Sequence, residues 1–169
     1  MNNILYILCG LPYAGKTTLR KELVKRFGFE FLNIDEIMEE KGMWKKDYIP
    51  TQEDWDNSYS EGYEQVKKLL ENNKNVVFDL GNLRFKEREA ARKLAENLNI
   101  KHKLIYINTP IGQIKKRRLE NKKTKKRGHI SDWLFKISLN MFEKPTAKEN
   151  PIIYDSGENL EKWIKENIN

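Results

Sequence analysis

The segment that most constrains the fold lies near the start of the chain, where an apolar run leads into a glycine-rich loop. Residues 4–9 are apolar throughout and predict a buried strand of a parallel sheet. Residues 10–17 spell G-x-x-x-x-G-K-T, and apolar residues recur at helical spacing after Thr17. A strand, a glycine loop and a helix in this order are the context that a phosphate-binding loop requires. The alternative interpretation is an ordinary glycine turn between two elements.

The residue types in this loop suit the phosphates of a nucleotide. Glycines let the backbone curl so that successive N–H groups face an anion, and the N-terminus of the following helix adds partial positive charge. Lys16 can reach the β- and γ-phosphates, and the hydroxyl of Thr17 can ligate Mg²⁺. ATP is favoured over GTP, because the chain contains no N-K-x-D sequence for guanine. The candidate nucleotide-binding residues are Gly10, Pro12, Tyr13, Ala14, Gly15, Lys16, Thr17 and Thr18.

Apolar runs and helical patterns alternate along the rest of the chain. Further strands are predicted at 29–34, 75–79, 103–108 and 151–154, and helices at 51–72, 83–98 and 158–168 and after Pro110 and Ser131. This alternation predicts an α/β fold, with a parallel sheet covered by helices on both faces. The length of 169 residues fits one domain spanning 1–169.

Two acids stand where predicted strands end, which is the edge at which sheets of this kind bind ligands. Asp79 closes an apolar strand, so it can hold Mg²⁺ directly or through water, with Asn82 as its neighbour. Asp35 follows the second strand, where a carboxylate can orient a substrate hydroxyl and accept its proton. Each acid has a plainer alternative as the cap of a following helix or turn. We therefore predict Thr17 and Asp79 as metal ligands and Asp35 as a catalytic residue.

The net charge of +7 is concentrated in one segment. Residues 115–127 contain nine Lys or Arg residues and one acid, so the rest of the chain sums to −1. Most of these lysines are expected on a solvated face. A basic segment after the fourth strand is also where small kinases keep a mobile lid, whose arginine neutralises charge during phosphoryl transfer. We predict a basic lid over residues 115–130, in which Arg117 or Arg118 is catalytic alongside Lys16.

The region 36–66 has an unusual composition for a segment beside the predicted site. Residues 35–64 hold ten acids and three lysines, interleaved with aromatic residues. Trp55, Tyr59 and Tyr63 recur at every fourth position, so they share one face of a helix. Such a stripe is more often core packing than a ligand cage. We predict that 36–66 binds the acceptor, and the net charge of −7 over 35–64 favours a neutral or cationic small molecule.

The remaining features are those of an ordinary cytoplasmic protein. The single cysteine, Cys9, cannot form an internal disulfide, and its place at the end of a strand favours a small buried residue over a reactive thiol. No apolar run has the length that a membrane span needs, and residues 1–8 lack a basic n-region. His102 and His129 have no ligand-like spacing, so neither is expected to bind metal or act in catalysis.

Taken together, these motifs resemble those of a known family. The chain is similar to the small P-loop kinases grouped as AAA-type ATP-binding predicted kinases, which are related to the kinase domain of polynucleotide kinase, to zeta toxins and to chloramphenicol phosphotransferase. The matching segments are, in order, GLPYAGKTTL, NIDEI, VVFDLGNLRFKER, HKLIYINTP, KKRR and MFEKPTAKENPIIYD. The resemblance implies a three-layer P-loop NTPase fold with a five-stranded parallel sheet and ATP–Mg²⁺ as the phosphate donor. It also implies Asp35 as the general base and Arg117 or Arg118 as the lid arginine.

One position departs from the pattern of polynucleotide kinases. Those enzymes carry an arginine three residues after the base, where it handles the phosphate of the acceptor, and this chain has Met38 there. Together with the acidic surroundings, this disfavours a 5′-hydroxyl nucleic acid as the acceptor. The hypothesis is therefore an ATP-dependent kinase that acts on a hydroxyl of a small molecule. The alternatives are a polynucleotide 5′-hydroxyl kinase, whose lid contacts the strand, and a regulatory protein that binds nucleotide without transferring phosphate.

Overall fold

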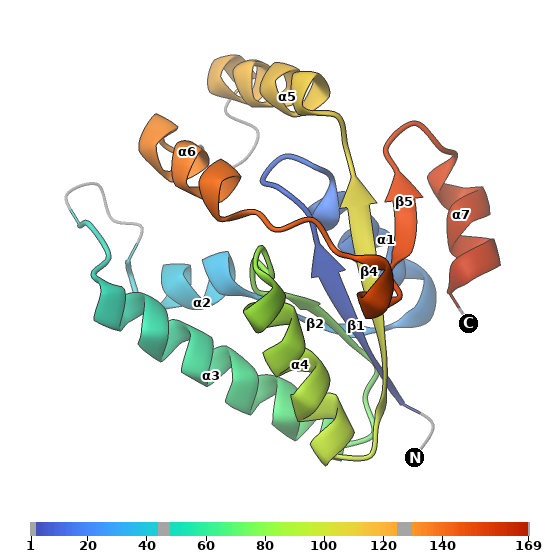
Figure 1. The fold of residues 1–169 in the computed structure, drawn as a ribbon. Coiled ribbons are helices and arrows are strands. Elements are labelled where there is room, and N and C mark those ends of the chain that lie inside the picture. The colour runs from blue at the N-terminus through green and yellow to red at the C-terminus, as the bar shows by residue number, and fades with distance from the viewer. Residues whose placement is uncertain (1–2, 44–47, 125–129, 169) are drawn as a thin grey trace.

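The centre of the molecule is a sheet of five parallel strands (Figure 1). The structure is a computed structural model that describes residues 3–43, 48–124 and 130–168. The strands are β1 (Ile4–Cys9), β2 (Glu30–Asn33), β3 (Val76–Asp79), β4 (Lys101–Asn108) and β5 (Ile152–Asp155). Their order across the sheet is β2-β3-β1-β4-β5. The predicted parallel α/β sheet is confirmed, with all five predicted strands present.

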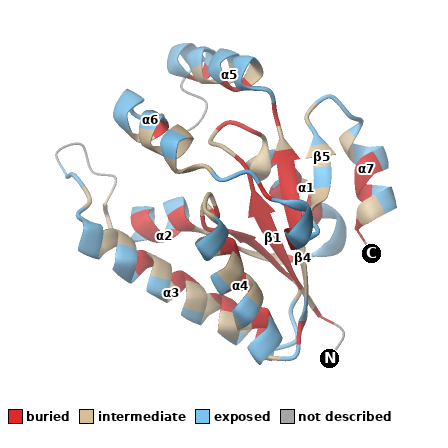
Figure 2. Ribbon diagram, in the orientation of Figure 1, coloured by how far each residue is buried: buried red, intermediate tan, exposed pale blue. Residues whose placement is uncertain are grey.

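Side chains alternate along the central strands and so divide the core into two layers. Leu5, Ile7 and Cys9 of β1 belong to one layer, whereas Tyr6 and Leu8 belong to the other. All five are fully buried, as the red strands of Figure 2 show. A strand covered on both faces reads as a continuous apolar run, which is why residues 4–9 carry no polar alternation. Burial raises the pKa of the Cys9 thiol to about 11, in keeping with an inert core residue.

Seven α-helices flank the sheet within the described ranges. They are α1 (Lys16–Phe27), α2 (Ile34–Glu40), α3 (Gln52–Glu71), α4 (Phe85–Asn97), α5 (Ile111–Thr124), α6 (Asp132–Met141) and α7 (Leu160–Asn167), with a 3₁₀ turn at Ala147–Glu149. Helices α2, α3 and α4 supply one core layer, and α1 and α7 supply the other together with single residues of α5 and α6. None of the described helices has an apolar stretch of the length that a bilayer crossing needs.

Capping residues determine where α2, α3 and α6 begin, and the predicted end of the second strand is corrected. Thr51 and Asp54 form the predicted capping box at the start of α3, and Ser131 caps α6. The second strand ends at Asn33, because the Asn33 side chain caps α2 and starts the helix one residue later. Asp35 therefore lies in the first turn of α2 and is not its cap, so that plainer alternative for Asp35 is wrong.

The aromatic stripe of α3 is part of the core. Trp55, Tyr59 and Tyr63 are partly buried and pack against the core layer on their side of the sheet. The ring centroids of Tyr63 and Phe78 of β3 are 5.3 Å apart. The expectation that this stripe serves packing is confirmed.

The strand order places the glycine loop at a topological switch point. From β1 the chain leads to β2 on one side of the sheet, whereas β4 leads to β5 on the other. The arrowheads of β1 and β4 point to the edge over which α5 and α6 lie (Figure 1). Ligands of open α/β sheets bind at this edge, in the crevice beside the switch point.

Candidate active site

Two glycines in left-handed backbone conformations shape the loop between β1 and α1. Gly10 has a φ of +153°, and a Cβ at this position would lie 2.9 Å from the carbonyl oxygen of Ile107 in β4. Gly15 has a φ of +124° and directly precedes α1. A side chain at Gly10 would push the loop away from β4, so glycine is required there.

The middle of the loop is a tight turn. The amide of Ala14 donates to the carbonyl oxygen of Leu11 at 3.1 Å, and the turn encloses Pro12 and Tyr13. Tyr13 has a φ of +66°, in the region that favours glycine, and its side chain is buried. The backbone therefore curls as a phosphate-binding loop requires.

The first turn of α1 carries the side chains predicted to contact phosphate and metal. The ammonium nitrogen of Lys16 donates to the carbonyl oxygens of Gly10 at 2.9 Å and Leu11 at 3.4 Å, so the side chain folds back over its own loop. Thr17 is half-buried, and Thr18 is exposed. The amides of Thr18 and Leu19 donate to the carbonyl oxygen of Gly15 at 3.0 and 3.1 Å, so the N–H groups that this helix end offers to an anion are those that precede Thr18.

Asn33 connects the two acids at the ends of β2 and β3. Its Nδ2 donates to Asp79 Oδ2 at 3.3 Å, while its Oδ1 accepts from the amide of Asp35 at 2.9 Å. Asp79 is 3% exposed, whereas Asp35 reaches solvent. The structure thus brings both predicted acids to one edge of the sheet. Sequence reasoning missed Asn33, although an asparagine between a strand and an amphipathic stretch is a typical cap signal.

Asp35 reaches solvent, but protein surrounds its carboxyl group on most sides. This burial raises the pKa of Asp35 above its ordinary value, and the negative charge of Asp79 adds to the effect. The positive charges of Lys16 and Arg20 act in the opposite direction. Arg20 is buried in α1 and donates to Glu36 Oε1 at 3.0 Å, so it also anchors the first turn of α2.

Thr17 and Asp79 offer oxygen ligands of the kind that Mg²⁺ prefers. They follow adjacent strands, since Thr17 comes after β1 and Asp79 ends β3. The buried Asp79 carboxylate accepts a hydrogen bond from the side-chain amide of Asn33, which carries no charge. A cation bound here would therefore balance the negative charge of Asp79. The described residues include no cluster of three or more ligating side chains. A Mg²⁺ ion here would therefore take phosphate oxygens and water as its other ligands.

The two candidate arginines of α5 have different partners. Arg117 Nη1 donates to the carbonyl oxygens of Tyr13 at 3.2 Å and Ala14 at 2.7 Å, so it lies directly on the loop. Arg118 instead pairs with Asp132 at the start of α6. Arg117 thus contacts the glycine loop, while Arg118 connects α5 with α6.

A hollow of about 250 Å³ opens beside the loop. Its walls come from the loop, from the start of α1, from α5 and from the segment that runs from β5 into α7. The lining residues are Tyr13, Ala14, Gly15, Thr18, Leu19, Arg117, Tyr154, Ser156 and Leu160. Half of the predicted nucleotide-binding residues are among them. Aromatic and aliphatic walls with a few polar groups are typical of small-molecule sites.

A buried ion pair holds the segment after β3 in place. Arg88 of α4 and Glu149 form two hydrogen bonds of 2.7 and 3.0 Å, and both side chains are 1% exposed. Arg88 also donates to the carbonyl oxygen of Asn82, whose own side chain donates to that of Leu8 in β1. This network fixes the chain that follows Asp79. Sequence reasoning missed it, because nothing local separates Arg88 from the other charged residues of its helix.

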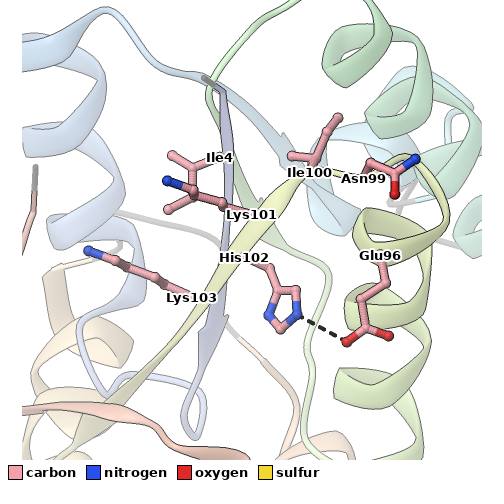
Figure 3. A pocket seen from close by; sticks show the side chains of 7 residues that line it. All are labelled: Ile4, Glu96, Asn99, Ile100, Lys101, His102 and Lys103. Carbon is pink, nitrogen blue, oxygen red and sulfur yellow. Dashed lines mark hydrogen bonds and ion pairs between the residues drawn. The ribbon is translucent and has the colours of Figure 1, made fainter. Parts of the chain in front are cut away.

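A wider hollow lies at the opposite edge of the sheet, where β1 and β4 begin (Figure 3). Its lining includes His102 and the two flanking lysines, Lys101 and Lys103. The Nε2 atom of His102 lies 3.2 Å from Glu96 Oε1. Ligands of such sheets bind at the other edge, so we place the candidate site there. His129 and the part of the predicted lid from 125 to 129 lie outside the described residues.

Comparison with known proteins places the chain in a family. A family model described as an AAA domain matches residues 5–145, which contain the glycine loop, both acids and both candidate arginines. The chain belongs to this family. Its resemblance to AAA-type P-loop kinases, first seen in the sequence motifs, is thereby confirmed.

One protein with a similar sequence is a kinase by name. The L-seryl-tRNA(Sec) kinase of Methanococcus maripaludis is 30% identical over 151 residues, which are 86% of this chain and 54% of that protein. The chain thus spans about half the length of this relative.

Solved structures share the fold at lower identity. A sugar kinase from Janibacter sp. HTCC2649 superposes with a TM-score of 0.69 at 19% identity, covering 98% of this chain and 92% of that one. The APS kinase CysC of Mycobacterium tuberculosis, solved with AMPPNP and APS, gives a TM-score of 0.65 at 14% identity, with 99% and 96% covered. These likenesses establish the three-layer α/β P-loop fold.

Proposed function

We propose that this protein is an ATP-dependent kinase that transfers the γ-phosphate of ATP–Mg²⁺ to a hydroxyl of a small-molecule acceptor. The observation that carries the proposal is the Asn33 bridge between Asp79 and Asp35. A phosphate-binding loop alone would serve any nucleotide-binding protein. Transfer to a hydroxyl needs in addition a second acid, such as the exposed Asp35 whose backbone amide Asn33 links to the predicted metal ligand.

The donor would lie along the loop. The hollow beside Tyr154 and Leu160 has the size and lining to accept the nucleoside, and the loop N–H groups would receive the phosphates. Lys16 would exchange its contacts with loop carbonyl oxygens for the β- and γ-phosphates. Thr17 and Asp79 would hold Mg²⁺, which would supply positive charge against that of the phosphates.

The acceptor would approach from the side of α2. Asp35 would orient its hydroxyl and accept the proton as the hydroxyl oxygen bonds to the γ-phosphorus and ADP leaves with the bridging oxygen. Lys16 and Arg117 would neutralise the negative charge on the transferring group. A raised pKa suits Asp35 to this role, since a base works best when its pKa lies closer to the working pH.

The surroundings of Asp35 favour a neutral or cationic acceptor. Met38, which stands where polynucleotide kinases carry a phosphate-handling arginine, is fully buried in the core. Glu39 and Glu40 of the same helix are exposed, and their charges would repel a polyanion. Two other acids of this region are paired, Glu36 with Arg20 and Glu61 with Lys41.

A hydroxyl carried on an RNA is a second candidate acceptor. Helix α5 carries six basic residues and one acid, and Lys115, Lys116, Lys122 and Lys123 are exposed. The relative from Methanococcus maripaludis is by name a kinase for a seryl-tRNA. An acceptor with a small reactive end and a polyanionic remainder would fit acidic residues near Asp35 and basic residues on α5.

Phosphorus NMR of ATP–Mg²⁺ with a panel of acceptors tests the proposal. The panel contains nucleosides, sugars, aminoglycosides, a 5′-hydroxyl oligonucleotide and an aminoacylated RNA, and Lys16→Ala is the control. We expect a new phosphoester signal from a small molecule, absent with Lys16→Ala. A phosphoester formed only on an RNA would favour the second candidate. Tight ATP binding without phosphoester or ADP from any acceptor would contradict both and favour a regulatory protein.

A further inference from the structure

Tyr13 holds a backbone conformation that its residue type disfavours. Its φ is +66°, and the other non-glycine residues with positive φ in the described ranges are all asparagines. Asparagine tolerates this region through local hydrogen bonds, whereas in other residues with a side chain the Cβ crowds the following carbonyl oxygen. Contacts outside the loop must therefore hold Tyr13 in place.

The side chain of Tyr13 supplies those contacts by docking on the start of α6. The phenol oxygen accepts a hydrogen bond from the amide of Ile130 at 3.2 Å. The ring meets that of Phe135 edge to face, with centroids 6.3 Å apart and an interplanar angle of 72°. Tyr13 is 6% exposed, so these contacts are shielded from water.

Two arginines of helix α5 also contact Tyr13 and the residues at the start of α6. Arg117 donates to the carbonyl oxygen of Tyr13, and Arg118 donates to that of Ile130 at 3.0 Å. The guanidinium of Arg118 also lies over the Phe135 ring, 4.8 Å from its centroid. The loop, α5 and the start of α6 thus form a closed set of contacts, in which Tyr13 is the member that belongs to the loop.

We propose that Tyr13 is a positioning residue that couples the start of α6 to the phosphate-binding loop. The inference rests on the proposed nucleotide site. The docked ring fixes the backbone at residues 13–15, and with it the directions of the N–H groups that receive the β- and γ-phosphates. Movement of α6 would therefore change the affinity of the loop for a nucleoside triphosphate without any contact between α6 and the nucleotide.

The test compares Tyr13→Phe with Tyr106→Phe. Tyr106 is a second tyrosine with a hydrogen-bonded phenol, which donates to Asn108 Oδ1 at 3.0 Å, but it belongs to the other core layer. We expect Tyr13→Phe to weaken ATP–Mg²⁺ binding about 3- to 10-fold, the range for loss of one hydrogen bond. Tyr106→Phe should leave the affinity within about 2-fold, with a similar loss of thermal stability in both variants.

Phe135→Leu separates positioning from direct contact between Tyr13 and the nucleotide. It leaves the loop sequence intact, and we expect weaker ATP binding in the same range. In the double variant with Tyr13→Phe, the loss should be smaller than the product of the two single losses, because the Ile130 hydrogen bond and the Phe135 ring contact hold the same side chain. An unchanged affinity in Tyr13→Phe, or a loss there with none in Phe135→Leu, would overturn the inference.

A measurement on nucleotide-free protein tests the coupling between α6 and the loop independently of the proposed function. In nucleotide-free protein, the ¹⁵N amide signals of Gly15 and Lys16 should shift in Tyr13→Phe and Phe135→Leu but not in Tyr106→Phe. If the unmodified protein bound no ATP, the proposed function would be wrong while these shifts would still report the coupling. If the signals did not shift, the coupling itself would be refuted.

Discussion

Contacts with neighbouring residues hold the backbone of Asp35 at the start of α2. Asn33 accepts a hydrogen bond from its amide, and Arg20 anchors the adjacent Glu36. These contacts fix the backbone of Asp35 in the first turn of α2, where the charge of Asp79 contributes to its raised pKa. Carboxyl groups with perturbed pKa values cluster at functional sites, which supports the proposed role of Asp35.

Replacing Asp35 with asparagine tests its role with almost no change in shape. We expect the rate of phosphoester formation to fall at least about 100-fold, which is the usual contribution of a positioned base. ATP affinity should stay near that of the unmodified protein, because the loop is untouched. Glu39→Gln, on the same helix, is the control in steady-state assays. A full rate in Asp35→Asn would show that Asp35 is not the base.

The pH dependence of the reaction follows from the raised pKa of Asp35. The base must be deprotonated, so kcat/KM should rise with pH through a pKa above the ordinary aspartate value of about 3.9. This acidic limb should vanish from the residual activity of Asp35→Asn. A limb that persists in that variant would belong to another group.

The two arginines of α5 should respond differently to substitution. Arg117→Ala should lower kcat at least about 100-fold with little effect on thermal stability, because Arg117 meets the loop. Arg118→Ala should mainly lower the melting temperature, since Arg118 joins α5 to α6. Kinetics and thermal unfolding of both variants decide the assignment. The reverse pattern would make Arg118 the lid arginine.

Between elements, Arg88 of α4 and Glu149 form a fully buried ion pair. Glu149→Gln leaves a buried guanidinium without its charged partner, so we expect a loss of about 3 kcal/mol in the free energy of unfolding. Glu161→Gln removes the acid that pairs with both Lys165 and Arg26 on the surface and should cost less than about 1 kcal/mol. Denaturant titration of both variants measures the difference. Equal losses would mean that the buried pair contributes no more than a surface pair.

The same pair predicts how acid destabilises the protein. Although burial opposes ionisation, hydrogen bonds from Arg88 and the Thr146 amide lower the pKa of Glu149 below its ordinary value. Its stabilisation is complete above the unfolded-state pKa of about 4.3 and is lost as pH falls through the lower folded-state value. Stability measured between pH 6 and 3 should therefore fall less steeply in Glu149→Gln. Parallel curves would contradict this contribution.

Elements were predictable from the sequence where their signal is local. The apolar run at 4–9, the capping box at Thr51 and the cap at Ser131 each lie within a few residues of the element they define. The boundary of β2 was missed, because a cap at Asn33 competes with strand propensity at 34. Arg88 and Glu149 stand 61 residues apart, so only the folded topology brings them together.

In the whole molecule, charge is divided between two regions near one edge of the sheet. The exposed lysines of α5 and the acids of α2 lie on different elements, and α5 appears largely exposed in Figure 2. The alternation of strands and helices predicted the sheet, and strand ends predicted where the acids meet. The identity of the acceptor depends on side-chain packing between elements, which no local pattern encodes.

The salt dependence of RNA binding tests whether the lysines of α5 bind an acceptor carried on RNA. With a small-molecule acceptor, binding of a tRNA-sized RNA should be weak, with a Kd above about 100 μM at 0.15 M salt. Replacing Lys115, Lys116, Lys122 and Lys123 with alanine should remove it and reduce the slope of log K against log salt. Nanomolar binding that survives 0.15 M salt would favour the RNA-borne acceptor.

The central claim is that the carboxyl edge of the sheet holds ATP–Mg²⁺ on the glycine loop with Asp79 as a metal ligand. Calorimetric titration of ATP tests it most directly, with and without Mg²⁺, on the unmodified protein, Lys16→Ala and Asp79→Asn. We expect one ATP per chain, binding at least about 10-fold weaker in Lys16→Ala, and a gain from Mg²⁺ that Asp79→Asn loses. Affinity that is unchanged in Lys16→Ala, or independent of Mg²⁺ in the unmodified protein, would contradict the claim.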